Sequence, residues 1–423
     1  MGTNAAGTAA VGNGVAIEVS ADCSAATCVI GGDTAGERNV ISGNTWGINL
    51  VSGANTWDIK NNYIGLAADG VSAVANGIGI IIGSGVYDVV IGEDSATPST
   101  YNIISGNTGQ GIYLGGANGS TITVNGNRIG TNAAGTGAVA NDHGLWIENG
   151  TPILTVGNAL ATTPTNQISG NTNYGLGLHQ SAGSTVNVYS SIIGLNATGT
   201  TAIANGGDGI FIDKPFTAIG AGSLTAGFNV ISGNTDNGIQ LSGGSTTGTI
   251  NGNLIGTNLA GDAAVGNGGN GIEAFNLVSS GIIVGDSSSA SITNVISGNT
   301  EYGITLGEGG DGNVIYSSSI GTNKAGDGVL ENTLGAIHIF NVLNTVVGNT
   351  ISAGFNVLAG DGGNGIKTTR NNDELNYVTV KGNYIGTGIN GTEDFGFGNG
   401  ITGSGQNMTI GSTTVGEGNE IAN

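Results

Sequence analysis

Residues 102–135 read NIISGNTGQGIYLGGANGSTITVNGNRIGTNAAG, and this one stretch contains the motifs from which the fold follows. Ile-Ser-Gly-Asn begins at Ile104, and the same or a degenerate tetrapeptide recurs every 62 to 65 residues. Ile-Gly-Thr-Asn begins at Ile129 and recurs, with small variations, at the same interval. Short motifs at a fixed spacing indicate a repeat protein in which each unit packs against its neighbours.

A finer motif divides each repeat in two. Glycine followed by aliphatic, any residue, aliphatic recurs at intervals of 29 to 35 residues, at Gly14, Gly47, Gly79, Gly111, Gly144, Gly175, Gly209, Gly238, Gly271, Gly303, Ala336, Gly365 and Gly400. Alternation with period two indicates a strand with one buried face. Because no helical pattern separates the copies, the strands cannot form βαβ units and must stack coil upon coil.

The predicted fold is therefore all-β: a right-handed parallel β-helix of about 13 coils, with three short strands per coil and coils paired into repeats of about 64 residues. We expect residues 1–423 to form a single domain. The closing asparagines of the third strand are predicted to stack as a ladder of amides, at Asn4, Asn44, Asn107, Asn132, Asn171, Asn196, Asn234, Asn258, Asn299 and Asn323.

Composition agrees with a coil of many turns. The chain has 84 Gly in 423 residues, and only 9% of its residues are charged, against a usual share of about 25%. Its formal net charge is −21, which opposes binding to nucleic acid. No apolar stretch is long enough to span a bilayer as a helix, so we also expect no membrane insertion.

The repeats Asn-x-Ile-Ser-Gly-Asn-Thr, Gly-Ile-x-Leu and Gly-Asn-x-Ile-Gly-Thr-Asn-x-Ala-Gly resemble those of right-handed parallel β-helix proteins of the bacterial surface and secreted type. That resemblance covers essentially the whole chain and implies kinship with the pectate-lyase-like solenoid superfamily. Its members include polysaccharide lyases and hydrolases, phage tailspikes, adhesins and passenger domains. The repeat itself transfers no catalytic signature to this chain.

Localisation is inferred from the same resemblance and from the two cysteines, Cys23 and Cys28, which either form a local disulfide or remain free thiols. A disulfide implies an oxidising compartment. The N-terminus lacks a signal peptide and begins inside a repeat, so we expect a segment of a longer extracellular or cell-surface protein. Neither end carries an evident cap, which predicts end-to-end self-association, detectable by sedimentation at high concentration.

One cluster stands out among the outward positions of the first strand. Tyr113, Trp146 and Phe211 are aromatic residues on nearby coils, and Gln240 and Glu273 follow in the same column. Exposed aromatic rings beside polar groups suit stacking on sugars, so these five residues are the candidate ligand-binding set.

Beside the aromatic residues, Glu148, His179 and Asp213 fall on three consecutive coils and are the catalytic candidates. Carboxyls two coils apart would be separated by roughly 9 to 10 Å, near the upper end for an inverting glycosidase. The basic side chains that a polyuronate lyase requires are scarce there.

We therefore favour an extracellular structural or adhesin-like rod that binds polysaccharide or a cell-surface glycan along an exposed strand face. The alternatives are a glycoside hydrolase or polysaccharide lyase and a self-assembling filament. We expect no cofactor and no zinc site, because none of the three histidines has a second His or Cys at metal-ligand spacing. The stretch Gly309–Gly312 weakly resembles a Ca²⁺-binding loop but is not tandem, and it is interpreted as a turn.

Overall fold

The computed structural model describes residues 1–24, 28–244, 247–277, 281–360, 362–369, 377–404 and 407–422. The chain is a parallel β-solenoid of about 13 coils with three strands per coil, and each strand pairs in parallel with the equivalent strand of an adjacent coil. Its single short helix among the described residues is the 3₁₀ turn η1 (Ala35–Glu37). No helix in the described ranges has the length and apolar character needed to cross a membrane.

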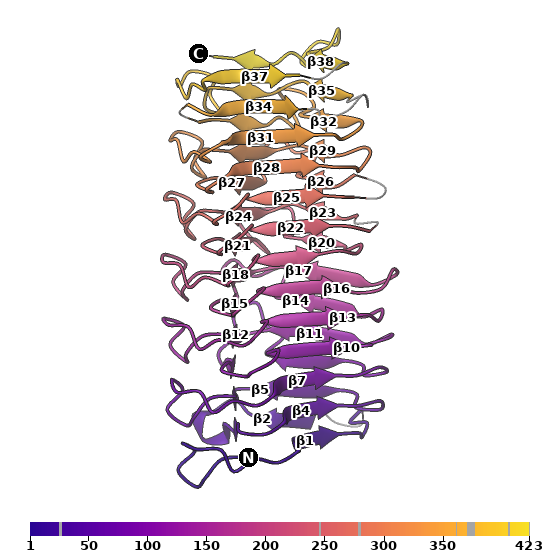
Figure 1. The fold of residues 1–423 in the computed structure, drawn as a ribbon, viewed down its shortest axis with the longest axis vertical. Coiled ribbons are helices and arrows are strands. Elements are labelled where there is room, and N and C mark those ends of the chain that lie inside the picture. The colour runs from indigo at the N-terminus through magenta and orange to yellow at the C-terminus, as the bar shows by residue number, and fades with distance from the viewer. Residues whose placement is uncertain are drawn as a thin grey trace. The chain divides into compact units, whose positions relative to one another are not determined.

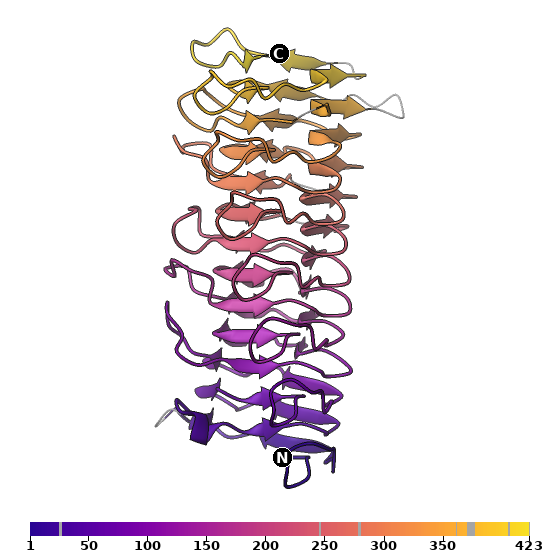
Figure 2. The same cartoon turned by 90° about the vertical axis from the view of Figure 1, so that its left-hand side faces the viewer.

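The chain divides into two compact units, unit 1 (Met1–Ile210) and unit 2 (Phe211–Asn423). In each, every third strand belongs to the same sheet, and successive strands of that sheet lie one above another (Figure 1). The turned view shows the same stacking from the side (Figure 2). The strand β19 (Ile210–Ile212) contains the division between the units.

Sheet 1 is built from the strands that carry the Gly-aliphatic motif, and we call the first residue of each motif a glycine station. In unit 1 its strands are β1 (Val15–Val19), β4 (Trp46–Leu50), β7 (Ile78–Ile82), β10 (Ile112–Gly115), β13 (Leu145–Glu148) and β16 (Leu176–His179). In unit 2 they are β22 (Ile239–Ser242), β25 (Ile272–Phe275), β28 (Tyr302–Gly307), β31 (Gly335–Phe340), β34 (Asn364–Thr369) and β37 (Asn399–Gly403).

Sheet 2 holds the second strand of each coil. In unit 1 these are β2 (Cys28–Gly31), β5 (Trp57–Lys60), β8 (Val89–Gly92), β11 (Thr121–Asn125), β14 (Ile153–Val156) and β17 (Thr185–Val188). In unit 2 they are β20 (Ala218–Ile219), β23 (Thr249–Ile250), β26 (Ile283–Val284), β29 (Val314–Ile315), β32 (Thr345–Val347), β35 (Val378–Val380) and β38 (Met408–Ile410).

Sheet 3 holds the strands that carry the two tetrapeptide motifs. In unit 1 these are β3 (Val40–Ile41), β6 (Tyr63–Ile64), β9 (Asn102–Ile104), β12 (Asn127–Ile129), β15 (Asn166–Ile168) and β18 (Ser191–Ile193). In unit 2 they are β21 (Asn229–Ile231), β24 (Asn253–Ile255), β27 (Asn294–Ile296), β30 (Ser318–Ile320), β33 (Val357–Leu358), β36 (Tyr384–Ile385) and β39 (Glu420–Ile421).

Columns of aliphatic side chains fill the interior of each unit. Ile80, Ile112 and Leu145 occupy equivalent positions of successive sheet 1 strands and are completely buried. The glycine before each of these positions is needed for space. A Cβ on Gly111 would lie 3.0 Å from both the Asn141 amide and a methyl group of Ile129, so a side chain there would displace the core.

Buried asparagines form a ladder along the interior of each unit. In unit 1 the amide Nδ2 of each member donates to Oδ1 of the next at 2.9 to 3.1 Å, through Asn44, Asn76, Asn107, Asn141, Asn171 and Asn205. Unit 2 has the same arrangement at Asn234, Asn267, Asn299 and Asn332. Each internal asparagine of the ladder therefore accepts a hydrogen bond from the asparagine of one neighbouring coil and donates one to that of the other.

The predicted asparagine column was wrong in half of its members. Five of them bond within their own exposed loops, where Oδ1 accepts the backbone N–H four residues later: Asn4, Asn132, Asn196, Asn258 and Asn323. The chain leaves the coil after each Ile-Gly-Thr-Asn motif, as the bridge between Thr131 and Ala138 shows. The ladder position is taken by the asparagine that follows the loop, such as Asn141.

The register of the first coil also differs from the prediction. Ile17, not Val15, pairs with Ile48, so the strand is displaced by two residues. Glu18 consequently lies beside Asn49, whose amide donates to the Glu18 carboxylate at 3.3 Å. A displacement of two residues preserves which side chains face inward, and hydrophobic alternation therefore cannot distinguish the two registers.

Candidate functional site

Strand β13 positions the central residues of the predicted patch. Leu145 and Ile147 are completely buried, so Trp146 and Glu148 must face outward from sheet 1. Within unit 1, Trp146 pairs in register with Tyr113 on one neighbouring strand. On the other neighbouring strand, His179 is the register partner of Glu148. The structure therefore brings four of the predicted site residues onto one outer face.

Trp146 lies over a glycine that makes room for it. Gly177 is its register partner on β16, and a Cβ at that position would collide with the indole ring. The indole plane is parallel to the ring of Tyr174, with an angle of 3° and centroids 6.2 Å apart. A flat aromatic surface is thus held against the backbone of the next coil.

Two histidines complete this group of rings. The imidazoles of His143 and His179 each have their centroids 4.3 Å from that of Trp146. We call His143, Trp146, Tyr174 and His179 the ring cluster. His143 and Tyr174 were missed by the sequence analysis because each precedes a glycine station and so falls outside the outward columns that alternation defines. The signal that could have found them is an aromatic or His residue before Gly144 and Gly175.

Polar groups border the ring cluster. The Tyr113 hydroxyl donates to a carboxylate oxygen of the exposed Glu148 at 2.6 Å. Partial burial is the main cause that raises the pKa of Tyr113, and this hydrogen bond raises it further, to about 12. At neutral pH the phenol is therefore protonated and holds the carboxylate in place at the edge of the rings.

His143 is neutral at pH 7 for a related reason. Burial lowers the pKa of its imidazole, and the neighbouring Asp142 carboxylate, 3.5 Å from Nε2, only partly offsets that effect. Its Nδ1 accepts the backbone N–H of Tyr174 at 3.3 Å, which assigns the proton to Nε2. A neutral His143 imidazole and the rings of Trp146 and Tyr174 therefore lie next to the Asp142 and Glu148 carboxylates.

The third catalytic candidate belongs to unit 2. Asp213 follows β19 and forms an ion pair with Lys214 at 3.6 Å. Phe211, on β19, also belongs to unit 2. The structure thus brings Glu148 and His179 together on paired positions of unit 1, whereas Asp213 and Phe211 are residues of the other unit.

Gln240 and Glu273 occupy paired positions on β22 and β25 of unit 2. The Asn237 amide donates to both, at 2.7 Å to Gln240 and 3.1 Å to Glu273. Burial, with a smaller repulsion from Glu301, raises the pKa of Glu273. These two predicted binding residues are members of a polar network on the outer face of sheet 1 in unit 2.

A histidine site in unit 2 was not predicted. His338 on β31 has its ring 4.9 Å from that of Tyr302, and its Nε2 lies 2.8 Å from the Thr369 hydroxyl. Burial and the adjacent Lys367 charge lower the pKa of His338 to about 4. Its sequence neighbours show no metal-ligand or catalytic spacing, and only the coil register reveals its polar partners.

The two cysteines, Cys23 and Cys28, are joined by a disulfide.

Comparison with known proteins finds no relative: no protein-family model matches the chain, and no curated protein or solved structure matches it.

Proposed function

We propose that this chain is an extracellular, structural β-solenoid of the bacterial surface or secreted type that binds carbohydrate through the ring cluster of unit 1. The observation that carries the proposal is the Trp146 indole, which packs over Gly177 and lies parallel to the ring of Tyr174. A flat aromatic pair on the outside of a strand face does not fill the core, so it is suited to contact with a ligand.

The chemistry of the cluster matches that of a sugar. The axial C–H groups of a pyranose pack against an aromatic face, while its hydroxyls need hydrogen-bond acceptors beside that face. Asp142 and Glu148 provide carboxylate oxygens at the border of the rings. Because these acceptors are anionic, the proposed ligand is a neutral polysaccharide, whose hydroxyls donate to them.

The scaffold supports an extracellular structural role. Amide ladders connect successive coils within each unit, which resists local opening of the stack. The Cys23–Cys28 disulfide is the bond expected of a protein from an oxidising compartment. Both features favour a rigid support that presents a binding surface outside the cell.

The test is affinity electrophoresis of the full chain in gels containing soluble neutral polysaccharides. Trp146→Ala is expected to weaken the affinity measured by retardation at least about fivefold, since an aromatic contact of this kind contributes on the order of 1 kcal/mol beyond its buried area. Trp46→Ala is the matched control, because Trp46 is 40% exposed on the same sheet and lies outside the ring cluster. Equal retardation of wild type and Trp146→Ala would overturn the proposal.

The enzymatic alternative is distinguished by product formation. Release of oligosaccharides from the same polysaccharides, lost in Glu148→Gln or Asp213→Asn, would replace the structural proposal by a glycoside hydrolase or lyase. Binding without product formation is the outcome that the structural proposal predicts.

A further inference from the structure

A second candidate site lies on the outer face of sheet 3 in unit 1. The strand register places Val40, Tyr63, Ile103 and Arg128 in one column across β3, β6, β9 and β12. A cavity of about 220 Å³ opens over this column, and its lining includes Arg38, Arg128, Tyr63 and Tyr101. Its floor is apolar, because Ile103 is almost fully buried there against Tyr63.

Arg38 is held rigidly at one end of the cavity. Its Nε and Nη2 both donate to Oδ1 of Asn61, at 3.2 and 2.9 Å, and its Nη1 donates to the Tyr63 hydroxyl at 3.1 Å. The guanidinium also stacks on the Tyr63 ring, 4.4 Å from its centroid. All of these partners are uncharged, so they orient the cation without neutralising it.

Arg128 is the second cation of the cavity. Its guanidinium lies 4.9 Å from the centroid of Tyr101, and its Nη1 donates to the carbonyl oxygen of Ala133. Burial lowers the pKa of Arg128, and no carboxylate among the described residues forms an ion pair with it. An arginine stays protonated in such surroundings, so a partly buried positive charge remains without a counter-charge.

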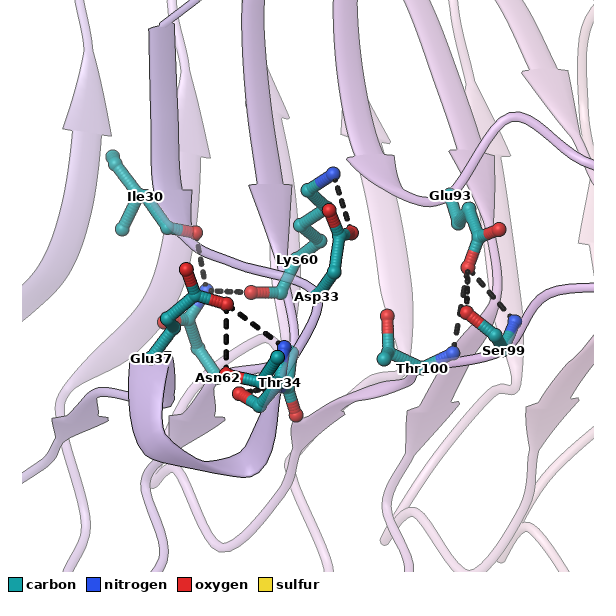
Figure 3. Close-up of polar contacts among 10 residues, drawn as sticks. Ile30, Asp33, Thr34, Glu37, Lys60, Asn62, Glu93, Ser99 and Thr100 are labelled. Atoms are coloured by element: carbon teal, nitrogen blue, oxygen red, sulfur yellow. Dashed lines mark hydrogen bonds and ion pairs between the residues drawn. The ribbon is translucent and has the colours of Figure 1, made fainter.

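Three acidic side chains, each within two residues of a lining residue in the chain or bonded to one, already have other partners (Figure 3). Glu93 accepts from the backbone N–H and hydroxyl of Ser99, at 2.8 and 3.1 Å, and Glu37 accepts from the backbone N–H of Thr34 at 2.9 Å. The Asp33 carboxylate pairs with Lys60 at 2.7 Å. In a chain with 29 acidic and only eight basic residues, two of the three arginines thus share one cavity and have no acidic ion-pair partner within the described ranges.

We propose that this cavity binds an anionic sugar, with a carboxylate or phosphoryl group held between Arg38 and Arg128 and the ring against Tyr63, Tyr101 and Ile103. Planar guanidinium groups match oxoanions in a bidentate geometry, and the desolvated site strengthens that attraction. The volume suits one sugar residue. A smaller cavity of about 50 Å³ also borders Tyr101 and Arg128 and extends toward Gln167, which leaves room for a substituent beyond the anionic group.

The test is calorimetric titration of the full chain with glucuronate, glucose 6-phosphate, inorganic phosphate and glucose at low ionic strength. Both anionic sugars are expected to bind at least tenfold more tightly than glucose, and their ratio identifies carboxylate or phosphoryl as the preferred group. Inorganic phosphate binding as tightly as glucose 6-phosphate would overturn the role given to the ring. Equal binding of glucose and both anionic sugars would overturn the whole proposal.

Arginine variants assign the binding to this cavity. Arg38→Met and Arg128→Met are each expected to weaken glucuronate binding at least tenfold, whereas Lys214→Gln removes one positive charge in unit 2 and should leave it unchanged. Wild-type affinity in both arginine variants would refute the assignment.

A second measurement does not depend on the folding of variants. Glucuronate should slow phenylglyoxal modification of Arg38 and Arg128 in the wild-type chain, read by peptide mass spectrometry; unchanged modification rates would contradict the proposal. Trp146→Ala should leave this protection intact, which separates the anion site from the ring cluster.

Discussion

Replacing Asn141 by alanine tests whether the amide ladder stabilises the stacked coils. Asn141 is 1% exposed and takes part in four hydrogen bonds. Its Oδ1 accepts the backbone N–H of Asn107 at 3.1 Å and the Asn107 amide at 2.9 Å. Its Nδ2 donates to the carbonyl of Ile104 at 2.9 Å and to Oδ1 of Asn171 at 3.1 Å. Asn141→Ala leaves the partners of all four bonds buried.

The magnitude follows from that number of bonds. Each buried hydrogen bond contributes about 1 kcal/mol net, so Asn141→Ala is expected to lower the free energy of unfolding by about 4 kcal/mol. Desolvated partners that find no replacement increase the loss, while a water entering the space left by the side chain decreases it. The loss of stability should be greatest where the coil of Asn141 packs against the coils of Asn107 and Asn171.

Urea unfolding followed by circular dichroism measures the global change, and hydrogen exchange measures the local one. The backbone amide of Asn107, which donates to Asn141, should exchange much faster in the variant. Asn118→Ala is the control, because Asn118 is exposed and its side chain forms no hydrogen bond with the described residues. A loss within 1 kcal/mol of that control, with unchanged exchange at Asn107, would refute the reasoning.

Three further predictions concern the outer face and pH. Gly177→Ala should displace the Trp146 indole and cost about 1 to 3 kcal/mol, seen as a shift in tryptophan fluorescence and a lower unfolding midpoint. Glu148→Gln should lower the pKa of Tyr113 from about 12 toward its ordinary value, measured by ultraviolet titration of the phenol. The pKa of His338 is lowered to about 4 in the folded chain, whereas an unfolded histidine titrates near 6.5. The unfolded chain therefore binds a proton at His338 at a higher pH than the folded chain, so the free energy of unfolding should decrease as pH falls from about 6.5 to 4.

Each of these has its own check. Gly14→Ala introduces the same methyl group where no other atom lies within 4 Å, so its fluorescence should match wild type. An unchanged pKa of Tyr113 in Glu148→Gln would contradict the effect assigned to its hydrogen bond with Glu148. Lys367→Gln should raise the pKa of His338 in a proton NMR titration, because the neighbouring positive charge is lost; an unaltered titration would contradict that cause.

The inward residues of the coils could be predicted because the repeat itself specifies them. Ile48, Ile80 and Ile112 are completely buried, as alternation after each glycine station predicts. A residue at an inward position must pack against equivalents above and below, which restricts it to aliphatic side chains. The same constraint does not determine an offset of two residues, which is why Ile17 rather than Val15 pairs with Ile48.

The candidate site was predictable only in part. Tyr113, Trp146, Glu148 and His179 were identified because strand register alone determines their neighbours. Tyr174 and His143 were missed, since their rings reach the cluster from the corner before the strand. Asn132 was assigned to the ladder because its motif looks equivalent to that of Asn107, although the loop after it redirects the chain.

By itself the sequence determined the coil number, the three-strand coil and the buried columns, because a one-dimensional repeat imposes the same local environment on every copy. Only the tertiary structure decided which side chains from the corners and loops meet those of the outer strand faces. Arg38 and Arg128 stand far apart in the chain, yet loops of particular length and direction bring both to one cavity. Packing inside a coil is specified by periodicity, whereas contacts at its corners depend on how each loop closes, and no periodic pattern records that path.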